Sequence, residues 1–485
     1  MSDAVAGLRP EAVWRYFSEI SAIPRCSKAE DRIAKYVMDK AKELGLEAKQ
    51  DRQMNIVVKK PASSGQEGAP MVCLQGHLDM VCEKNKDVDH DFDSDPIEIV
   101  RDGNVIKAKG TTLGADNGIA VATNLALMED RSLQHGALEF LFTVDEETGL
   151  TGAGNLKKGF LESQILLNLD SEEEGALYVG CAGGRDTKGT WRVSFTRAPG
   201  GWAPMRLKVQ GLKGGHSGLE IDKGRGNSIK ILARVLFALD EVGARLSRIE
   251  GGNKRNAIPR EAEAIVFIPK DKTRKAQSIV KLFDEMVRAE LATVDAGLVV
   301  TLERAGEVDE RGVLKRDQQK SILHTLMALP HGVTKMSADI PDLVETSTNV
   351  AVITTDKGAI EVETSQRSSV ASEIADIVQT VTSIFELGGA RVVQDSGYPG
   401  WKPNMESPIL KIAKATYRQL YGREPEVKAV HAGLECGIIG EKYPGMDMIS
   451  FGPTLEDVHS PDEKIHIDTV EKFWEFTLAI LKNVH

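Results

Sequence analysis

Short apolar runs alternate with helical patterns through the first part of the chain. The runs 71–74, 138–144 and 165–169 are bounded by turn-forming or polar residues, which predicts three buried strands. Between the first two runs, residues 119–128 form an apolar, alanine-rich stretch that predicts a helix. Strands that alternate with helices in this way indicate an α/β domain with a mostly parallel sheet.

The hydrophobic pattern changes in the middle of the chain and then returns. Residues 205–210 alternate between apolar and charged or polar types, which is typical of a strand with one face in water. The last part of the chain resumes the first pattern, with a predicted strand over 446–451 and a final amphipathic helix. We therefore predict a mixed, mostly parallel α/β domain formed by 1–187 and 399–485, interrupted by an inserted α+β domain over 188–398.

Composition and charge describe an ordinary globular protein and narrow its partners. The chain has 485 residues, of which 41% are hydrophobic and 27% charged, and a formal net charge of -11. This negative charge argues against nucleic acid and anionic membranes as partners. The sequence has neither a basic segment followed by a long apolar stretch at its start nor an apolar run long enough to cross a membrane. These features predict a cytoplasmic protein.

The cysteines give no sign of a disulfide framework. The five cysteines are Cys26, Cys73, Cys82, Cys181 and Cys436. Their odd number, scattered positions and lack of CxxC spacing predict reduced thiols, as in a cytoplasm. Cys73 lies inside the predicted strand over 71–74 and suits a core position.

Polar residues that could bind or catalyse follow the predicted strand ends. His77 and Asp79 come soon after the run 71–74, and side chains two apart on an extended backbone point to the same face. In open α/β sheets, sites form outside the carboxyl ends of the strands. Alone, the His-x-Asp pattern carries little weight, because short motifs often match by chance. Its weight depends on whether other strand ends deliver further ligands.

Other strand ends and one loop supply such residues. The glycine-rich loop 110–118 precedes a helix but lacks the lysine of a phosphate-binding loop and carries Asp116 near its tip. A carboxylate in that position suits a cation better than an anion. The residues that follow the later predicted strands are Glu146, Glu147, Asp170 and His459.

This set of side chains indicates a two-metal hydrolytic site. Two imidazoles and several carboxylates are the usual ligands of a pair of Zn²⁺ or Mn²⁺ ions. Two such ions need a shared ligand, and Asp116 is a short carboxylate on a loop that can bridge them. Glu146 and Glu147 can divide two further tasks, one binding a metal and the other taking the proton of the attacking water. Asp79 can orient His77.

Simpler interpretations exist for each residue taken alone. Any of the carboxylates can be a solvated helix cap, and Glu146 with Glu147 can be an acidic pair at a helix N-terminus. His459, which precedes Ser-Pro, can be a turn residue. The joint occurrence of these residues at successive strand ends favours the metal site.

Six short motifs extend this pattern into a family resemblance. They are residues 76–80, 114–118, 146–149, 169–172, 214–218 and 458–461. In order and spacing they resemble the motif series of the co-catalytic zinc exopeptidases, which include the carboxypeptidase G, aminoacylase, peptidase T and carnosinase families. The chain is most similar to the bacterial aminoacylhistidine dipeptidases (Xaa-His dipeptidases, or peptidase D), whose sequence motifs recur at 256–260 and 431–437. The resemblance runs essentially end to end.

The resemblance implies a metal-binding role for five residues. His77 and Asp170 would hold one ion. Glu147 and His459 would hold the other, and Asp116 would bridge the two. Zinc is the expected metal, with manganese and cobalt as alternatives.

The resemblance also implies roles outside the metal shell. Glu146 would act as general base and then as general acid, and Asp79 would orient its histidine. The inserted domain would be a lid, in which His216 donates to the oxyanion while Asn256 and Arg367 bind the far end of the substrate. From the residues alone, a loop histidine among glycines is the preferred interpretation of His216. Asn256 can likewise be a turn residue, and Arg367 a solvated charge just after the apparent strand 360–363.

The activity implied is the hydrolysis of unblocked dipeptides, including Xaa-His and carnosine-like substrates, by a metal-activated water. An N-acyl amino-acid deacylase or desuccinylase on the same site is a second hypothesis. A non-enzymatic metal- or peptide-binding protein is a third, and the intact Glu146 argues against it. A homodimer is compatible with the resemblance.

Overall fold

The computed structural model of the protein describes residues 2–306, 312–356 and 358–485. The chain folds into two compact units, and the second is formed mainly by an insertion into the first. The first unit comprises Met1–Cys181, Trp401–Ala429 and Leu434–His485, and the second comprises Ala182–Gly400 and Val430–Gly433.

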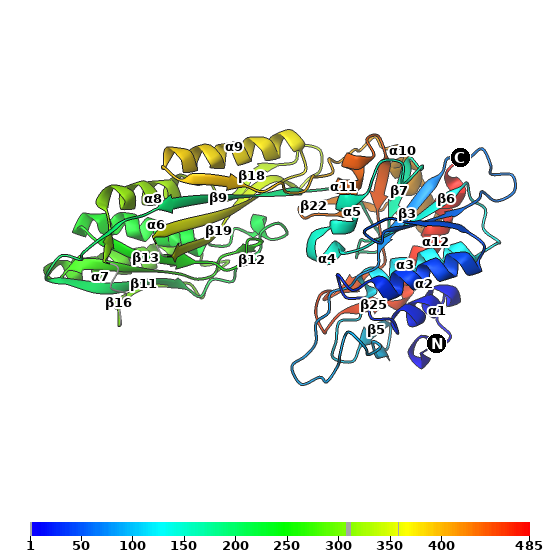
Figure 1. The fold of residues 1–485 in the computed structure, drawn as a ribbon, viewed down its shortest axis with the longest axis horizontal. Coiled ribbons are helices and arrows are strands. Elements are labelled where there is room, and N and C mark those ends of the chain that lie inside the picture. The colour runs from blue at the N-terminus through cyan, green and yellow to red at the C-terminus, as the bar shows by residue number, and fades with distance from the viewer. Residues whose placement is uncertain (1, 307–311, 357) are drawn as a thin grey trace. The chain divides into compact units, whose positions relative to one another are not determined.

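An eight-stranded mixed sheet forms the centre of the first unit (Figure 1). Its order is β1-β2-β6-β3-β7-β23-β8-β22. The four central strands β6, β3, β7 and β23 run parallel, whereas β1, β2 and β8 pair antiparallel toward the edges. The strands are β1 (Glu47–Gln50), β2 (Ile56–Lys60), β3 (Val72–His77), β6 (Leu138–Thr143), β7 (Ile165–Asn168), β8 (Ala176–Cys181), β22 (Glu426–Val430) and β23 (Asp447–Ser450). The predicted mixed α/β fold is confirmed.

The helices of this unit pack on the sheet and on one another. Helix α3 contacts β3, α1 and α2, while α10 contacts β23 and α12. The helices are α1 (Glu11–Ile20), α2 (Asp31–Glu43), α3 (Ala115–Glu129), α4 (Glu146–Gly149), α5 (Thr151–Asn155), α10 (Pro408–Tyr421), α11 (Glu435–Lys442) and α12 (Ile467–Asn483). A separate four-stranded sheet contains β4 (Ile99–Asp102), β5 (Val105–Ala108), β24 (Leu455–Glu456) and β25 (Lys464–His466). Within the described part of the chain, no helix combines the length and apolarity needed to cross a bilayer.

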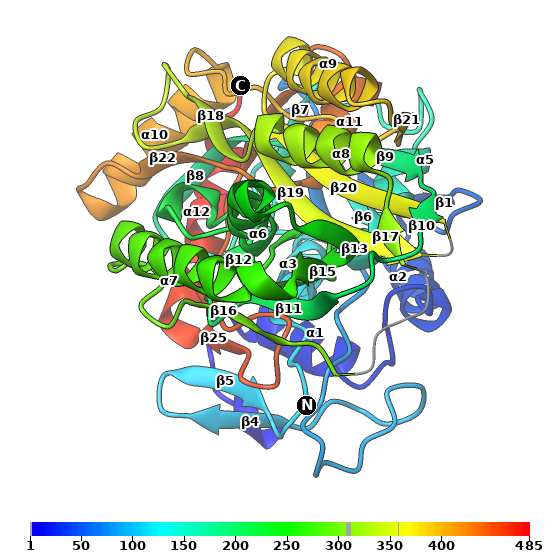
Figure 2. The same cartoon turned by 90° about the vertical axis from the view of Figure 1, so that its left-hand side faces the viewer.

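The second unit is an antiparallel sheet covered by helices (Figure 2). The path β16-β11-β15-β13-β19-β20-β9-β21, with β18 paired to β19, makes nine strands. These are β9 (Gly183–Arg192), β11 (Trp202–Gln210), β13 (Arg245–Gly251), β15 (Ala262–Pro269), β16 (Val299–Arg304), β18 (Gly332–Met336), β19 (Val344–Asp356), β20 (Ala359–Ser368) and β21 (Arg391–Gln394). Two short pairs join β10 (Phe195–Thr196) to β17 (Val313–Leu314) and β12 (Gly215–His216) to β14 (Ala257–Ile258).

Four helices form a layer against this sheet: α6 (Ser228–Ala238), α7 (Thr273–Glu290), α8 (Arg316–Ala328) and α9 (Ala371–Leu387). Apolar residues of both layers, among them Leu207, Leu232 and Phe385, fill the space between them and are fully buried. The alternation seen over 205–210 follows from this arrangement, because one face of β11 meets the helices while the other side carries Arg206, Lys208 and Gln210.

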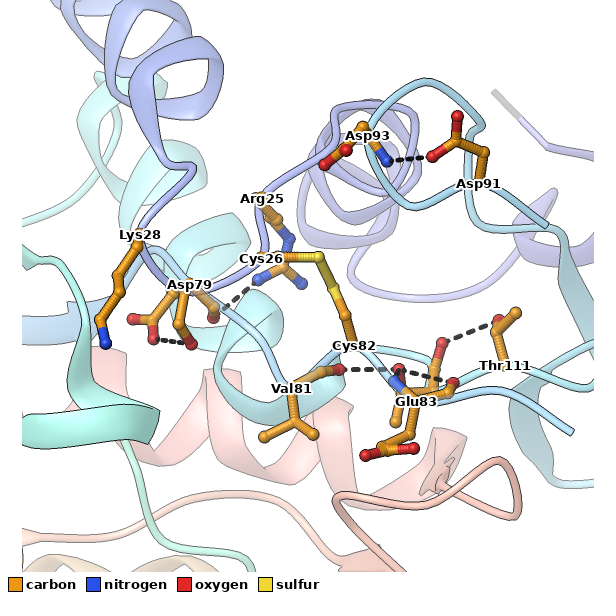
Figure 3. Close-up of a disulfide and its surroundings, with 12 residues drawn as sticks. Arg25, Cys26, Lys28, Asp79, Val81, Cys82, Glu83, Asp91, Asp93 and Thr111 are labelled. Carbon is orange, nitrogen blue, oxygen red and sulfur yellow. Dashed lines mark hydrogen bonds between the residues drawn. A yellow bond between two sulfur atoms is a disulfide. The ribbon is translucent and has the colours of Figure 1, made fainter.

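A disulfide joins Cys26 to Cys82, 56 residues apart in the sequence (Figure 3). The sequence-based prediction of five reduced thiols is therefore wrong for this pair. The cysteines meet because the segment after α1 runs beside the segment after β3, where Cys26 bridges to Met80. Nothing in the local spacing of the cysteines could indicate this tertiary contact. Cys73, Cys181 and Cys436 are free and buried.

Candidate metal centre

The parallel strands deliver their polar residues to one edge of the sheet. His77 is the last residue of β3, Asp170 follows β7 by two residues, and Glu146 follows β6 by three. Because the three strands run in the same direction, their carboxyl ends meet. Gly76 allows helix α3 to approach closely, since a Cβ at this position would lie 2.5 Å from Oδ1 of Asn117.

Five side chains form two groups that share one carboxylate. In the first group, Nε2 of His77 lies 3.1 Å from Oδ1 of Asp116 and 3.2 Å from Oδ1 of Asp170. In the second, Nε2 of His459 lies 3.1 Å from Oδ2 of Asp116 and 2.9 Å from Oε2 of Glu147. Each group has its ligand atoms within 4.8 Å of one another, as a metal ion requires. Asp116 therefore presents one oxygen to each group, which is the arrangement expected of a bridging ligand.

The electrostatics of this cluster fit a cation. Burial disfavours the imidazolium of His77, but Asp170 and Asp116 more than offset this and raise its pKa well above the usual value. Hydrogen bonds to Asp116 and Glu147 raise the pKa of His459 to about 11. Burial raises the pKa of Asp170 to about 6. The carboxylates of this cluster thus favour positive charge beside them, which a divalent cation can supply.

Unpaired atoms support the same interpretation. Oε1 of Glu147 is buried without a hydrogen-bond partner among the described residues, and Oδ1 of Asp170 has only its ion-pair contact with His77. A buried carboxylate oxygen without a partner is costly in a folded protein unless a cation completes its surroundings. Nitrogen and carboxylate oxygen donors suit zinc and manganese. The residues present therefore fit a pair of divalent ions.

Asp79 contacts residues of both groups: the imidazole of His77 in the first and the backbone of Glu147 in the second. Its Oδ1 lies 3.4 Å from Nδ1 of His77, and its carboxylate accepts hydrogen bonds from Oγ of Ser27 (2.8 Å) and from the N–H groups of Glu146 (3.1 Å) and Glu147 (3.2 Å). Burial works to raise the pKa of Asp79, but His77 and these donors outweigh it and hold the pKa at about 2. A permanently ionised Asp79 fixes both the ring of His77 and the start of α4.

Glu146 and Glu147 occupy the first turn of α4, yet they differ in their contacts. The carboxylate of Glu147 contacts His459, whereas none of the hydrogen bonds between described residues uses the carboxyl group of Glu146. Burial, followed by the nearby charges of Asp170 and Glu435, raises the pKa of Glu146 well above its usual value despite the opposing effect of His77. A carboxyl group of this kind can hold a proton as well as release it.

The backbone is strained where it carries these residues. His459 has a φ of 62° and Asp145, which precedes Glu146, has a φ of 51°. Both lie in the left-handed region that non-glycine residues rarely adopt, at a cost of about 1–3 kcal/mol each. Such residues gather at functional sites. Here the left-handed backbone occurs at His459, whose own side chain belongs to the cluster, and at Asp145, directly before Glu146.

His216 and Arg367 lie in the second unit, near each other. A Cβ added to Gly218 would lie 3.1 Å from Cε1 of His216 and 3.3 Å from Nε of Arg367. Nδ1 of His216 accepts hydrogen bonds from the N–H groups of Gly218 (3.2 Å) and Leu219 (3.1 Å). This assigns the ring proton to Nε2, and burial lowers the pKa of His216 to about 4. His216 is thus a neutral side chain with an N–H to donate.

Arg367 is a buried residue within β20 and not a solvated charge beyond a strand. Its Nη1 donates a hydrogen bond to the hydroxyl of Tyr398 at 2.9 Å, while its Nε is buried without a partner among the described residues. A buried guanidinium with a free donor is suited to an anionic group. Asn256 is exposed in the loop before β14, and its backbone carbonyl accepts a hydrogen bond from the N–H of Ser217 at 2.8 Å.

The structure thus brings seven of the predicted residues together in the first unit, and His216, Asn256 and Arg367 belong to the second. Two residues of the first unit that contact the backbone of this site were not predicted, Arg25 and Glu463, and neither was the buried Glu435, which accepts hydrogen bonds from Gln75 and Thr143. The signal for Glu463 was its place four residues after His459, but a lone acid in a loop cannot be distinguished from surface charge by pattern.

Comparison with known proteins extends over nearly the whole chain. Residues 73–483 match the family described as peptidase family M20/M25/M40. The cytosol non-specific dipeptidase of Escherichia coli (strain K12) is 40% identical over 478 residues, which cover 98% of each chain. The crystal structure of an aminoacylhistidine dipeptidase from Vibrio alginolyticus superposes with a TM-score of 0.92 at 42% identity, covering 100% of this chain and 98% of that one. The aminopeptidase PepT from Bacillus cereus shares the fold, with a TM-score of 0.57, 18% identity, and coverage of 98% and 99%.

Proposed function

Because the chain belongs to peptidase family M20/M25/M40, we propose that it is a metal-dependent dipeptidase whose substrates are unblocked dipeptides, including Xaa-His dipeptides. The single observation that carries the metal-dependent part is the position of Asp116. Its two carboxylate oxygens each lie 3.1 Å from a different histidine, and each histidine has a second carboxylate close by. The names of the two relatives, a non-specific dipeptidase and an aminoacylhistidine dipeptidase, support the substrate class.

In this proposal the five residues of the cluster hold two divalent ions. His77 and Asp170 would hold one ion, Glu147 and His459 would hold the other, and Asp116 would be shared between them. Zinc is our first choice because the donor set is nitrogen and carboxylate oxygen, and manganese and cobalt suit the same donors. When bound, the two ions lower the pKa of a water molecule and polarise the peptide carbonyl.

The chain's own residues then carry the protons. Glu146 accepts a proton from the attacking water, because its carboxyl group is free of hydrogen bonds to described residues and lies among the ligands. The same carboxyl group returns the proton to the nitrogen of the leaving amine. The raised pKa of Glu146 suits this return step, since the proton must be held until the peptide bond breaks.

We assign substrate binding to the second unit, which would act as the lid domain. His216 donates from Nε2 to the oxygen that becomes negative in the transition state, as a neutral imidazole with a fixed tautomer can. Arg367 binds the free carboxylate of the dipeptide, and Asn256 contributes a further polar contact. The buried, unpaired Nε of Arg367 supports this assignment.

A substrate panel combined with metal analysis tests the proposal. The panel contains unblocked dipeptides, Xaa-His dipeptides, β-alanyl-histidine, and N-acetyl and N-succinyl amino acids, each assayed with the metal content determined on the same sample. We expect turnover of free dipeptides by protein that holds two ions per chain. Preferential turnover of N-acyl amino acids would favour a deacylase, and metal binding without any turnover would favour a binding protein.

We also propose that the enzyme works in the cytoplasm, which the name of the Escherichia coli relative, a cytosol dipeptidase, supports. The net charge of -11 supports small peptides over nucleic acid as partners. A homodimer is part of the proposal, and sedimentation analysis of the purified protein tests it.

A further inference from the structure

One carboxylate holds the loop that carries Asp116. Oε2 of Glu463 accepts hydrogen bonds from the N–H groups of Leu113 (2.7 Å) and Gly114 (2.9 Å), and Oε1 accepts from those of Ala115 (2.8 Å) and Asp116 (3.2 Å). The side chain of Glu463 is 2% exposed. Four consecutive N–H groups therefore converge on one buried side chain, and both of its oxygens act only as acceptors.

One guanidinium holds the same loop through its carbonyl groups. Arg25 is 2% exposed, and its Nη2 donates to the carbonyl of Gly114. Its Nη1 donates to the carbonyls of Leu78 (3.1 Å) and Asp79 (3.0 Å), in the segment directly after His77. Figure 3 shows Arg25 reaching toward this segment beside the disulfide. Arg25 thus connects the loop of Asp116 to the segment that carries His77 and Asp79.

Gly114 makes this contact possible. It has a φ of 67°, and a Cβ at this position would lie 2.5 Å from Nη2 of Arg25. Gly118 is similarly close, since its Cβ would lie 2.6 Å from the same nitrogen. The sequence Gly-Ala-Asp-Asn-Gly therefore fits around the guanidinium, and neither glycine could be replaced without displacing it.

Asp116 belongs to both groups of the metal centre, so a displacement of its backbone changes both groups at once. We propose that Glu463 and Arg25 are positioning residues, which set the place of the bridging carboxylate by binding the N–H groups and a carbonyl group of its loop. This inference rests on the proposed two-metal function. It assigns a role to two residues that touch neither the substrate nor the ions.

The alternative is that Glu463 only caps the N-terminus of α3 and stabilises the fold. The two roles differ in what they change. A cap affects the melting temperature, whereas a positioning residue also affects the affinity for both ions and the turnover number. The variant Glu463→Gln separates them, because the amide would place an NH₂ donor against N–H groups that need an acceptor.

The experiment measures metal binding by calorimetry on chelator-treated protein, using Mn²⁺ and Zn²⁺, together with kcat and KM for a dipeptide. We expect Glu463→Gln to bind both ions about 10- to 100-fold more weakly than wild type, with kcat reduced by a similar factor and KM changed little. Arg25→Lys keeps the charge but cannot reach three carbonyls, and it should show the same joint loss. Hydrogen exchange of the amides of 113–116 in metal-free protein should be faster in Glu463→Gln.

Two control variants separate charge and stability effects. Asp462→Asn removes a neighbouring exposed carboxylate and should leave both affinities unchanged. Ser407→Ala removes the cap of α10, where Oγ accepts from the N–H of Leu410, and should lower the melting temperature without changing metal affinity. If Glu463→Gln does not fold, Glu463→Asp and Arg25→Lys give the same two measurements.

The inference would be overturned if the folded variants at positions 463 and 25 bound both ions with the affinity of the wild type. A loss of affinity for one ion only would also overturn it, because Asp116 is shared. A wild-type protein that binds fewer than two ions would instead contradict the proposed function. The two failures are therefore distinguishable.

Discussion

The N–H of Glu146 donates to Oδ1 of Asp79 at 3.1 Å, so Asp79 fixes the backbone of Glu146 and leaves its carboxyl group free. The next residue is held in the same way, since the N–H of Glu147 donates to Oδ2 of Asp79 at 3.2 Å. One ionised carboxylate thus orients a histidine and two adjacent glutamates. Because neighbouring side chains in a helical turn point in different directions, the two glutamates can face different tasks.

The first prediction concerns this division of tasks. Glu146→Gln should keep both ions and lose turnover by a factor of about 10² or more, since a positioned general base contributes about 10²–10⁴. Glu147→Gln should weaken the binding of one ion, because its carboxylate contacts His459. Metal content and kcat, measured on the same samples, distinguish the variants. Equal metal loss in both would show that the assignment of roles is wrong.

A second prediction concerns recognition of the dipeptide's carboxylate. Arg367→Ala should reduce kcat/KM for free dipeptides by about 10- to 150-fold, because hydrogen bonds to charged groups contribute about 1.5–3 kcal/mol. Amidation of the substrate should cost the wild type far more than the variant. Arg234→Ala is a matched control, since this arginine pairs with Glu290 on the exposed side of α6. If Arg367→Ala affects free and amidated dipeptides equally, the carboxylate is bound elsewhere.

The fold class, and the meeting of His77, Glu146, Glu147 and Asp170 at one edge of the sheet, could be predicted from the sequence because both follow from strand periodicity. His77 follows one apolar run and Asp170 follows another, which places both residues near strand ends, and parallel strands bring such ends together. The predicted mixed α/β class and the membership of a peptidase family are confirmed. The metal-binding and catalytic roles of the individual residues stay predictions.

Contacts between segments that are distant in sequence could not be predicted. The four N–H groups bound by Glu463 come from residues about 350 positions earlier, and no local pattern encodes that meeting. The Cys26–Cys82 disulfide depends in the same way on two loops lying side by side. The local sequence predicts a solvated charge near a strand at Arg367, but β20 extends to Ser368 and pairs with strands on both sides, which buries the side chain.

A third prediction concerns the disulfide. Reduction should destabilise the first unit by about 2–4 kcal/mol, because the Cys26–Cys82 link closes a loop of more than fifty residues in the unfolded chain. The melting temperature of the wild type should therefore fall on addition of a phosphine reductant. A Cys26→Ser, Cys82→Ser double variant should melt at the lower temperature with or without it. Thiol titration of denatured, unreduced protein should find the three free cysteines Cys73, Cys181 and Cys436. A titration that finds five would contradict the disulfide.

A fourth prediction concerns pH and the buried Glu435. Oε2 of this residue accepts from Nε2 of Gln75 and Oγ1 of Thr143, both at 2.6 Å, while Oε1 is buried without a partner among the described residues. Burial raises its pKa to about 8, above the value of about 4.3 in an unfolded chain. Between these values the folded state binds the extra proton, so stability falls as pH rises, by at most about 1.4 kcal/mol per pH unit.

Glu435→Gln removes this titration while keeping the shape of the side chain. In metal-free protein, the melting temperature of Glu435→Gln relative to wild type should therefore rise steadily from pH 5 to pH 8. The comparison with wild type at each pH cancels the contributions of the other titrating groups. A difference that stays constant over this range would show that Glu435 is already ionised in the folded state at pH 5.

The most direct test of the two-metal account is a titration of chelator-treated protein with Zn²⁺ or Mn²⁺, in which metal binding and dipeptide hydrolysis are followed together. We expect no hydrolysis without metal, a folded protein throughout because the large core is independent of the ions, and full activity at two ions per chain. Asp116→Asn should lose tight binding of both ions, whereas His459→Ala should lose only one, since Asp116 is the one described residue whose side chain contacts both histidines. Hydrolysis by demonstrably metal-free protein, or two tightly bound ions in Asp116→Asn, would contradict the account.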